Sequence, residues 1–242
     1  GDLGSTLDGL LDAVGDGTGF GAVEWIADLQ ATRERWEDTV RGSQGSGEPG
    51  AIRTGAVVAA LRRAYPGPIN LVNDCGKHHK WILQQLPTVE DDYIVSSMGG
   101  ASMGIGLAGA IGAHLARPET PTIAWVGDGG LAMSLAALPT IGEYRLPIVT
   151  VVIDDASYGV VHNTQIAQVG RTAFADFDGS GANPGYRLDF EQVAEGCGVS
   201  ARTVRDPAEL DKAFAWARDL GGGGVLRPLQ DESRTLVWTP RS

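Results

Sequence analysis

Two aspartates that lie 27 residues apart stand out as candidates for chemistry. Asp128 lies in the run Gly127-Asp128-Gly129-Gly130, and Asp155 follows a separate apolar segment. Glycines let a backbone approach a ligand closely, and a helix that begins at Gly130 would present free N–H groups to a phosphate. Carboxylates repel a phosphate unless a divalent cation such as Mg²⁺ lies between them. The residues therefore predict a metal–diphosphate site built by Asp128 and Asp155.

Simpler interpretations exist for the same residues. Aspartates and glycines at strand ends also form turns and helix caps without binding any ligand. In addition, residues 104–109 (GIGLAG) match the GxGxxG pattern of dinucleotide-binding folds, with Asp128 about 20 residues further on. These glycines fall inside an Ala/Gly-rich helix, well past the preceding strand end, where close packing of the helix on a sheet explains them. A dinucleotide site remains an alternative.

Alternating apolar strands and helices would position the two aspartates. Continuous apolar strands between helices are typical of a parallel sheet covered on both faces, so we predict an α/β fold with a doubly wound parallel sheet. Ligands bind beyond the carboxyl ends of such strands, and a strand–helix–strand unit brings Asp128 and Asp155 to that edge. The expected strands are 69–72, 93–96, 122–126, 148–153, 199–204 and 224–229; the expected helices are 54–65, 103–115, 131–144 and 207–219.

A segment rich in glycine and serine divides the chain. Residues 43–50 are predicted to be a flexible linker. Residues 1–42 before it form a helical tail, with helices expected at 3–14 and 21–41, and residues 51–242 after it form the α/β domain. The polar, glycine-rich stretch 170–188 is expected to be a mobile loop over a site.

Composition excludes several classes of protein. The chain has 242 residues, of which 19 are basic and 30 acidic, and the net charge of −11 argues against a partner that is a nucleic acid or an anionic membrane. No apolar run approaches the roughly 18 residues of a membrane span, and no secretory signal is visible. Cys75 and Cys197 make no disulfide framework or zinc motif. A cytoplasmic location is therefore expected.

The motif around the two aspartates resembles that of a known superfamily. Gly127-Asp128-Gly129, followed by Asp155 and then Tyr158, is similar to the thiamine diphosphate motif of the pyruvate decarboxylase and acetolactate synthase superfamily. That motif normally reads GDG…NN, and here the asparagine pair is replaced by Asp154-Asp155, which keeps an oxygen ligand and adds negative charge. The resemblance implies thiamine diphosphate and Mg²⁺ as cofactors, with Asp128, Asp155 and Ser157 as metal ligands.

Two further segments narrow the resemblance to the C-terminal, diphosphate-binding half of the acetolactate synthase catalytic subunit. Residues 72–81 (VNDCGKHHKW) resemble that family's VTDVGQHQMW, with Lys77 where the family often has glutamine, and residues 97–107 (SMGGASMGIGL) resemble its SGGLGTMGFGL. The resemblance implies that Met103 holds the cofactor in its V conformation, and that residues 1–42 are the end of the family's central domain. The implied cofactor-binding residues are Gly76, Lys77, His78, Ala101, Met103, Gly127, Asp128, Gly129, Gly130, Asp155, Ser157, Tyr158, Gly159 and Val160.

The resemblance also implies a substrate pocket formed by Val161, His162 and Thr164. Thr164 stands where acetolactate synthases have a tryptophan, which predicts a roomier and more polar site. Simple decarboxylases place a proton-donating glutamate near Val161. An apolar valine there slows protonation and leaves the activated acyl unit free to attack a second carbonyl. We therefore expect carboligation of a 2-oxo acid, with 2-oxo acid decarboxylation as the alternative.

A catalytic group that the family requires is not expected in this chain. The glutamate that promotes ylide formation belongs to a pyrimidine-binding domain, so the catalytic residue here is unknown. The resemblance implies that a companion polypeptide, or the N-terminal part of the same enzyme, supplies that domain. It also implies an assembly of two or four such units. A non-catalytic cofactor-binding subunit that supports a partner is the alternative from another class.

Overall fold

The computed structural model describes residues 2–15, 23–43, 47–48, 51–97, 99–177, 183 and 186–228. The chain divides into two compact units, residues 1–42 and 43–242. The first contains α1, Leu3–Val14, and all but the last residue of α2, Val23–Ser43, close to the two predicted helices. Asp2 caps α1, because its carboxylate accepts a hydrogen bond from the Ser5 N–H at 3.0 Å.

The predicted linker and the predicted mobile loop are only partly described. Residues 44–46 and 49–50 of the linker lie outside the described residues, as do residues 178–182 and 184–185 of the loop. Within the linker, β1, Gly47–Glu48, pairs antiparallel with β2, Ala51–Ile52.

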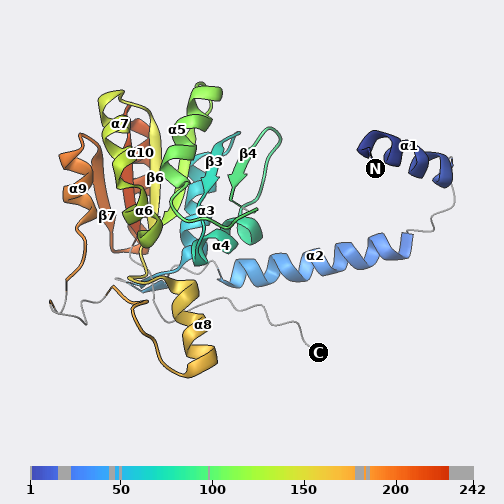
Figure 1. Ribbon diagram of the computed structural model, residues 1–242, viewed down its shortest axis with the longest axis horizontal. Coiled ribbons are helices and arrows are strands. Elements are labelled where there is room, and N and C mark those ends of the chain that lie inside the picture. The colour runs from blue at the N-terminus through green and yellow to red at the C-terminus, as the bar shows by residue number, and fades with distance from the viewer. Residues whose placement is uncertain are drawn as a thin grey trace. The chain divides into compact units, whose positions relative to one another are not determined.

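The second unit is built on a six-stranded sheet whose paired strands are all parallel (Figure 1). The strand order is β4-β3-β5-β6-β8-β7. Every predicted strand is present, and the fold class predicted from the sequence is confirmed. The strands are β3 Asn70–Asn73, β4 Tyr93–Ser96, β5 Thr122–Gly127, β6 Ile148–Ile153, β7 Ser200–Val204 and β8 Gly224–Pro228.

Helices cover both faces of this sheet, and a separate apolar core lies between the sheet and the helices on each face. On one face α3, Thr54–Ala64, α4, Lys77–Gln85, and α10, Leu210–Asp219, pack around Trp125 and Phe214. The helices on the other face are α5 Gly106–Ala116, α6 Asp128–Ser134, α7 Leu138–Glu143 and α9 Phe190–Gly196. The two central strands, β5 and β6, are buried along their whole length.

One helix is set apart from these layers. In α8, Gly159–Val169, only Gly159 is buried, and the helix lies beyond one end of the sheet (Figure 1). The same end carries the start of α6, which follows β5 directly. The carboxyl ends of the central strands therefore face α8.

The structure corrects the predicted helix boundaries. The helix expected at 131–144 is two helices, α6 and α7, joined by a 3₁₀ turn at Leu135–Ala137. Pro139 at the start of α7 explains the break, because proline has no N–H to continue the preceding helix. Helix α5 begins at Gly106, three residues later than expected. Helices α4, α8 and α9 were not predicted from the sequence.

Two glycines of the GxGxxG sequence, Gly106 and Gly109, serve helix packing, as the simpler interpretation expects, whereas Gly104 lies before the helix with a φ of +88°. A Cβ added at Gly106 would overlap the Val126 side chain, and one added at Gly109 would lie 2.9 Å from Val72 Cγ1. Both glycines lie within α5, which packs on β3 and β5.

Among the described residues, no helix combines the length and the apolar composition needed to cross a membrane.

Two glycines offer a matched test of the packing on this face. A Cβ at Gly142 in α7 would overlap the backbone carbonyl of Cys197, whereas a Cβ at Gly112 in α5 meets nothing within 4 Å. We expect Gly142→Ala to lower the free energy of unfolding by about 1–3 kcal/mol. Gly112→Ala should raise it by up to about 1 kcal/mol, because alanine favours a helix. Urea denaturation measures both, and equal effects of the two substitutions would contradict the packing described here.

Candidate functional site

A cavity of about 220 Å³ lies at the carboxyl ends of the central strands. It is formed by the segments that follow β3, β5 and β6 and by the loop before α5. Every residue that the resemblance implied for cofactor binding lines it, and Val161 lines it as well. The complete lining is Cys75, Gly76, Lys77, His78, Ala101, Met103, Gly127, Asp128, Gly129, Gly130, Ile153, Asp155, Ser157, Tyr158, Gly159, Val160 and Val161.

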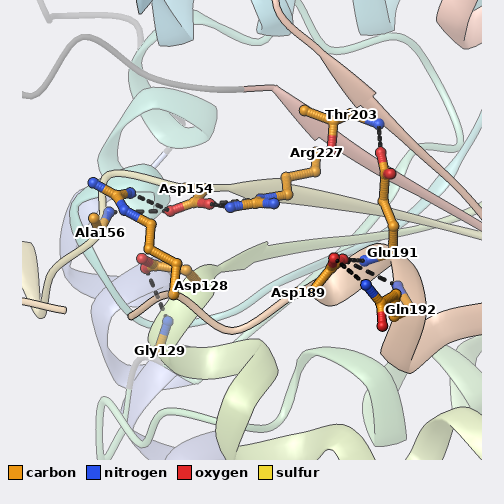
Figure 2. Close-up of polar contacts among 10 residues, drawn as sticks. Asp128, Gly129, Asp154, Ala156, Asp189, Glu191, Gln192, Thr203 and Arg227 are labelled. Atoms are coloured by element: carbon orange, nitrogen blue, oxygen red, sulfur yellow. Dashed lines mark hydrogen bonds and ion pairs between the residues drawn. The ribbon is translucent and has the colours of Figure 1, made fainter. Parts of the chain in front are cut away.

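Asp128 is the first residue of α6 and is almost fully buried. Its Oδ1 accepts a hydrogen bond from the Gly129 N–H at 2.9 Å, but its Oδ2 is buried without a partner among the described residues (Figure 2). Burial raises the pKa of Asp128 to about 9, and the negative charges of Asp154 and Asp155 add to the effect. An unpartnered oxygen in a cluster of negative charge is a position suited to a cation.

Asp155 also lines the cavity, and its carboxylate contacts two other predicted site residues. Its Oδ2 lies 2.9 Å from the Lys77 Nζ, and its Oδ1 accepts a hydrogen bond from the Ser157 hydroxyl at 3.2 Å. The structure therefore brings two of the three predicted metal ligands into direct contact. It also adds an ion pair with Lys77, from the first turn of α4.

Asp154 belongs to a different set of contacts (Figure 2). Its Oδ2 lies 2.6 Å from the Arg227 Nε, and its Oδ1 accepts a hydrogen bond from the Ala156 N–H at 3.1 Å. Arg227 comes from β8, more than 70 residues away, so no local pattern in the sequence could predict this pair. Asp154 lines a second cavity, of about 600 Å³, which also includes Asp128, Arg187 and Arg227.

The loop that carries Met103 is anchored by Asp74, a residue that the sequence analysis did not select. Both carboxylate oxygens of Asp74 lie 3.0 Å from the Gly104 N–H, and Oδ1 also accepts a hydrogen bond from the Cys75 N–H at 2.8 Å. The side chain is fully buried. A Cβ added at Gly130 would lie only 2.6 Å from the Asp74 Oδ2. Asp74 therefore holds Gly104, the residue after Met103, close to the start of α6.

Glycines bring the walls of the cavity close together. A Cβ at Gly129 would lie 2.7 Å from Tyr158 Cε1 and 3.3 Å from Met103 Cε, and a Cβ at Gly127 would lie 2.9 Å from His78 Nδ1. The GDGG run thus faces the side chains of three separate segments. Side chains at these positions would fill the space in which a ligand could lie.

Two predicted substrate-pocket residues, His162 and Thr164, do not line this cavity. The His162 Nδ1 lies 2.6 Å from Asp176 Oδ1, and the Thr164 hydroxyl donates to the Val160 carbonyl at 2.8 Å. Both lie on α8, and Thr164 is one helical turn further from the cavity than Val160, on the same side of the helix. Of the predicted substrate-pocket residues, Val161 alone lies at the cavity.

The donor set suits a magnesium ion whose coordination is completed by phosphate oxygens of a bound molecule. Within the described part of the chain, no group of three or more His, Cys, Asp and Glu side chains is arranged to hold a metal by itself. Mg²⁺, however, is usually held by one or two carboxylates together with phosphate oxygens and water. Asp128, with its unpartnered oxygen, and Asp155, with Ser157 beside it, fit that requirement.

A parallel α/β domain with a glycine-lined, acidic cavity at the strand ends belongs to the class that binds phosphate-bearing cofactors at this edge. Residues 74–226 match the family model described as "Thiamine pyrophosphate enzyme, C-terminal TPP binding domain". The chain therefore belongs to the thiamine pyrophosphate enzyme family.

Relatives within the superfamily include acetolactate synthases. The chain is 33% identical to the acetolactate synthase large subunit of Pyropia yezoensis over 63% of its own length, and 29% identical to an acetolactate synthase of Bacillus subtilis over 64%. It spans 25% and 26% of those two proteins. A solved structure, the thiamine diphosphate-dependent 4-hydroxybenzoylformate decarboxylase of Rhodococcus jostii RHA1, superposes with a TM-score of 0.64 at 26% identity. That match covers 78% of this chain and 34% of the decarboxylase.

The histidine at the cavity gives a testable pH dependence. Burial, with the neighbouring His79, lowers the pKa of His78 from 6.5 to about 3. Below pH 6.5 the unfolded chain therefore binds a proton that the folded chain does not, and this contribution to stability is lost as the pH falls toward 3. The raised pKa of Asp128 acts in the opposite direction over the same range, so the difference between wild type and a variant isolates His78.

We expect the free energy of unfolding of His78→Gln, relative to wild type, to rise by up to about 1.4 kcal/mol per pH unit as the pH falls from 6.5 to 5. Urea denaturation with a chelator present measures this difference. A difference that does not change with pH would contradict a neutral, buried His78.

Proposed function

We propose that this chain is the diphosphate-binding half of a thiamine diphosphate- and Mg²⁺-dependent enzyme. The enzyme decarboxylates a 2-oxo acid and transfers the resulting acyl unit to a second carbonyl, as an acetolactate synthase-like carboligase. The observation that supports this most directly is the buried, unpartnered Oδ2 of Asp128 in a cavity lined by all the residues implied for the cofactor. Family membership supports the cofactor, and the acetolactate synthase relatives support the reaction.

In this proposal some residues of the cavity bind the metal ion and others bind the diphosphate. Asp128, Asp155 and Ser157 would hold Mg²⁺, and N–H groups at the glycine-rich start of α6 would donate hydrogen bonds to phosphate oxygens. Lys77 contributes positive charge at the diphosphate, and His78, held neutral by burial, forms part of the cavity wall. These residues orient the cofactor, because each comes from a rigid strand end or from the first turn of a helix.

Thiamine diphosphate, when bound, stabilises the negative charge that develops when a 2-oxo acid loses CO₂. Residues of this chain would then determine whether the resulting acyl unit is protonated or attacks a second carbonyl. Met103, anchored through Asp74, supports the cofactor from one side, and Tyr158 faces it from the turn after β6. Val161 presents an apolar surface without a proton donor, which favours attack on a second carbonyl over release of an aldehyde.

Completion of the site is also a proposal. The chain spans about a quarter of the length of its acetolactate synthase relatives. We therefore expect the pyrimidine-binding domain, with its glutamate, to come from the rest of a longer chain or from a second polypeptide, in an assembly of two or four such units. The small-molecule partner is a 2-oxo acid.

Two alternatives have different support. A 2-oxo acid decarboxylase is favoured by the superposition on a 4-hydroxybenzoylformate decarboxylase, and analysis of the products formed from pyruvate separates it from the carboligase. A non-catalytic subunit that binds the cofactor and supports a partner predicts that turnover of the complex survives substitution of Asp128.

The metal site is tested by Asp128→Asn, which keeps the volume of the side chain and removes the carboxylate that a cation would bind. We expect at least about tenfold weaker binding of thiamine diphosphate in the presence of Mg²⁺, because an amide is a poorer ligand for a hard cation. Isothermal titration calorimetry measures the affinity. The control is Asp211→Asn, an exposed carboxylate that pairs with Arg63 on the surface. Equal affinity of wild type and Asp128→Asn would contradict the proposed site.

The reaction type is tested by Val161→Glu in the complete enzyme with its pyrimidine-binding domain. A carboxylic acid at this position supplies a proton, so the ratio of free aldehyde to ligation product formed from pyruvate should rise by about tenfold or more. Chromatography of the products measures the ratio. Val169→Glu, at the exposed far end of the same helix, is the control. A ratio that both variants leave unchanged would remove Val161 from the reacting centre.

A further inference from the structure

Two of the residues that depart from the family pattern are in contact with each other. Lys77 stands where that pattern often has glutamine, and Asp155 stands where it has the second asparagine. Their charged atoms lie 2.9 Å apart, and the side chains are only 20% and 13% exposed. Two neutral residues of the family pattern are thus replaced here by a shielded ion pair at the cavity.

The backbone leaves room for this pair. A Cβ at Gly159 would overlap the Lys77 side chain and would lie 2.6 Å from the Asp155 Oδ2. Gly159, the first residue of α8, therefore allows the lysine to reach the carboxylate from α4. The contact joins the segment after β3 to the segment after β6, on opposite sides of the cavity.

The pair changes the balance of charge in the cavity. Three carboxylates lie close together, on Asp128, Asp154 and Asp155. Arg227 and, at 3.9 Å, Arg187 offset the charge of Asp154, and Lys77 offsets that of Asp155. Of the three, Asp128 is the one whose Oδ2 has no partner within the described structure. A cation that enters the cavity must therefore compete with Lys77 for Asp155.

We propose that Lys77 is an internal counter-ion of Asp155 that couples the binding of the divalent cation to the binding of the diphosphate. This inference rests on the proposed function, since it concerns the same cavity. A cation alone displaces Lys77 from Asp155 and leaves the ammonium without a partner in a shielded place. A diphosphate alone draws Lys77 away and leaves the carboxylate unpaired. When both arrive together, Asp155 binds the cation and Lys77 binds a phosphate oxygen, so each charge exchanges one partner for another.

The coupling predicts that each of two substitutions tightens the binding of a different ion, measured on the full chain with each ion as a separate probe. Lys77→Gln frees Asp155, so Mn²⁺ alone should bind about tenfold more tightly than to wild type, since one shielded ion pair need no longer be broken. Asp155→Asn frees Lys77, so inorganic pyrophosphate alone should bind about tenfold more tightly than to wild type. Electron paramagnetic resonance reports free Mn²⁺, and calorimetry reports pyrophosphate.

Two further variants complete the experiment. Lys80→Gln, an exposed lysine on the same helix, removes the same charge outside the cavity and should leave both affinities as in wild type. Lys77→Gln/Asp155→Asn restores the neutral pair of the family pattern. In this double variant, the affinity for Mn²⁺ in the presence of pyrophosphate should exceed the affinity for Mn²⁺ alone by a smaller factor than in wild type. Thermal unfolding without ions confirms that each variant is folded.

The outcomes separate the two proposals. If Lys77→Gln binds Mn²⁺ no more tightly than wild type, or if neither binds it, the counter-ion role is overturned. A gain that Lys80→Gln shares equally is a general effect of charge and also overturns it. Failure of the proposed function appears differently, as no binding of thiamine diphosphate by wild type with Mg²⁺ present, whatever the Mn²⁺ affinities of the variants are.

Discussion

The cavity depends on the register between two buried strands. Gly127 at the end of β5 pairs with Ile153 at the end of β6, so the residues that come after each strand emerge side by side. Those residues are acidic, and the packed sheet keeps them out of water. Negative charges held together at low exposure repel one another unless cations offset them. That requirement explains the surroundings of the cavity: Arg227 lies on one side, Lys77 on the other, and Asp128 keeps an oxygen open to a cation.

The glycines are a second consequence of this crowding. Asp74, His78 and Tyr158 approach the start of α6 so closely that side chains at Gly130, Gly127 and Gly129 would collide with them. A buried carboxylate such as Asp74 needs partners, and it finds them in the N–H groups of Cys75 and Gly104. Its burial therefore fixes the loop that carries Met103 and, through the same side chain, limits what can stand at Gly130.

Much of this arrangement could be predicted from the sequence, because its signals are local. Continuous apolar strands predicted the parallel sheet, and the GDGG run next to one strand predicted the position of Asp128. The long-range partners could not be predicted in that way. Arg227 meets Asp154 only because β8 lies beside β6, and a pattern within one segment carries no information on strand order. His162 and Thr164 were assigned to a substrate pocket from the family resemblance, which carries no information on where α8 lies, and neither lines the cofactor cavity.

The two aspartates at the end of β6 show why a departure from a family pattern should be considered together with its neighbours in space. Taken alone, Asp154-Asp155 in place of two asparagines only adds charge beside Asp128, and Lys77 in place of glutamine only adds charge near a diphosphate. In the structure the added charges are compensated: Asp154 by Arg227 and Asp155 by Lys77. The charges added at Asp155 and Lys77 therefore offset each other within one ion pair, and the charge added at Asp154 lies beside two arginines, Arg227 and Arg187. An ionic contact of this kind in a shielded cavity is costly to break unless other charges replace it, so these residues link the binding of a cation to the binding of an anion.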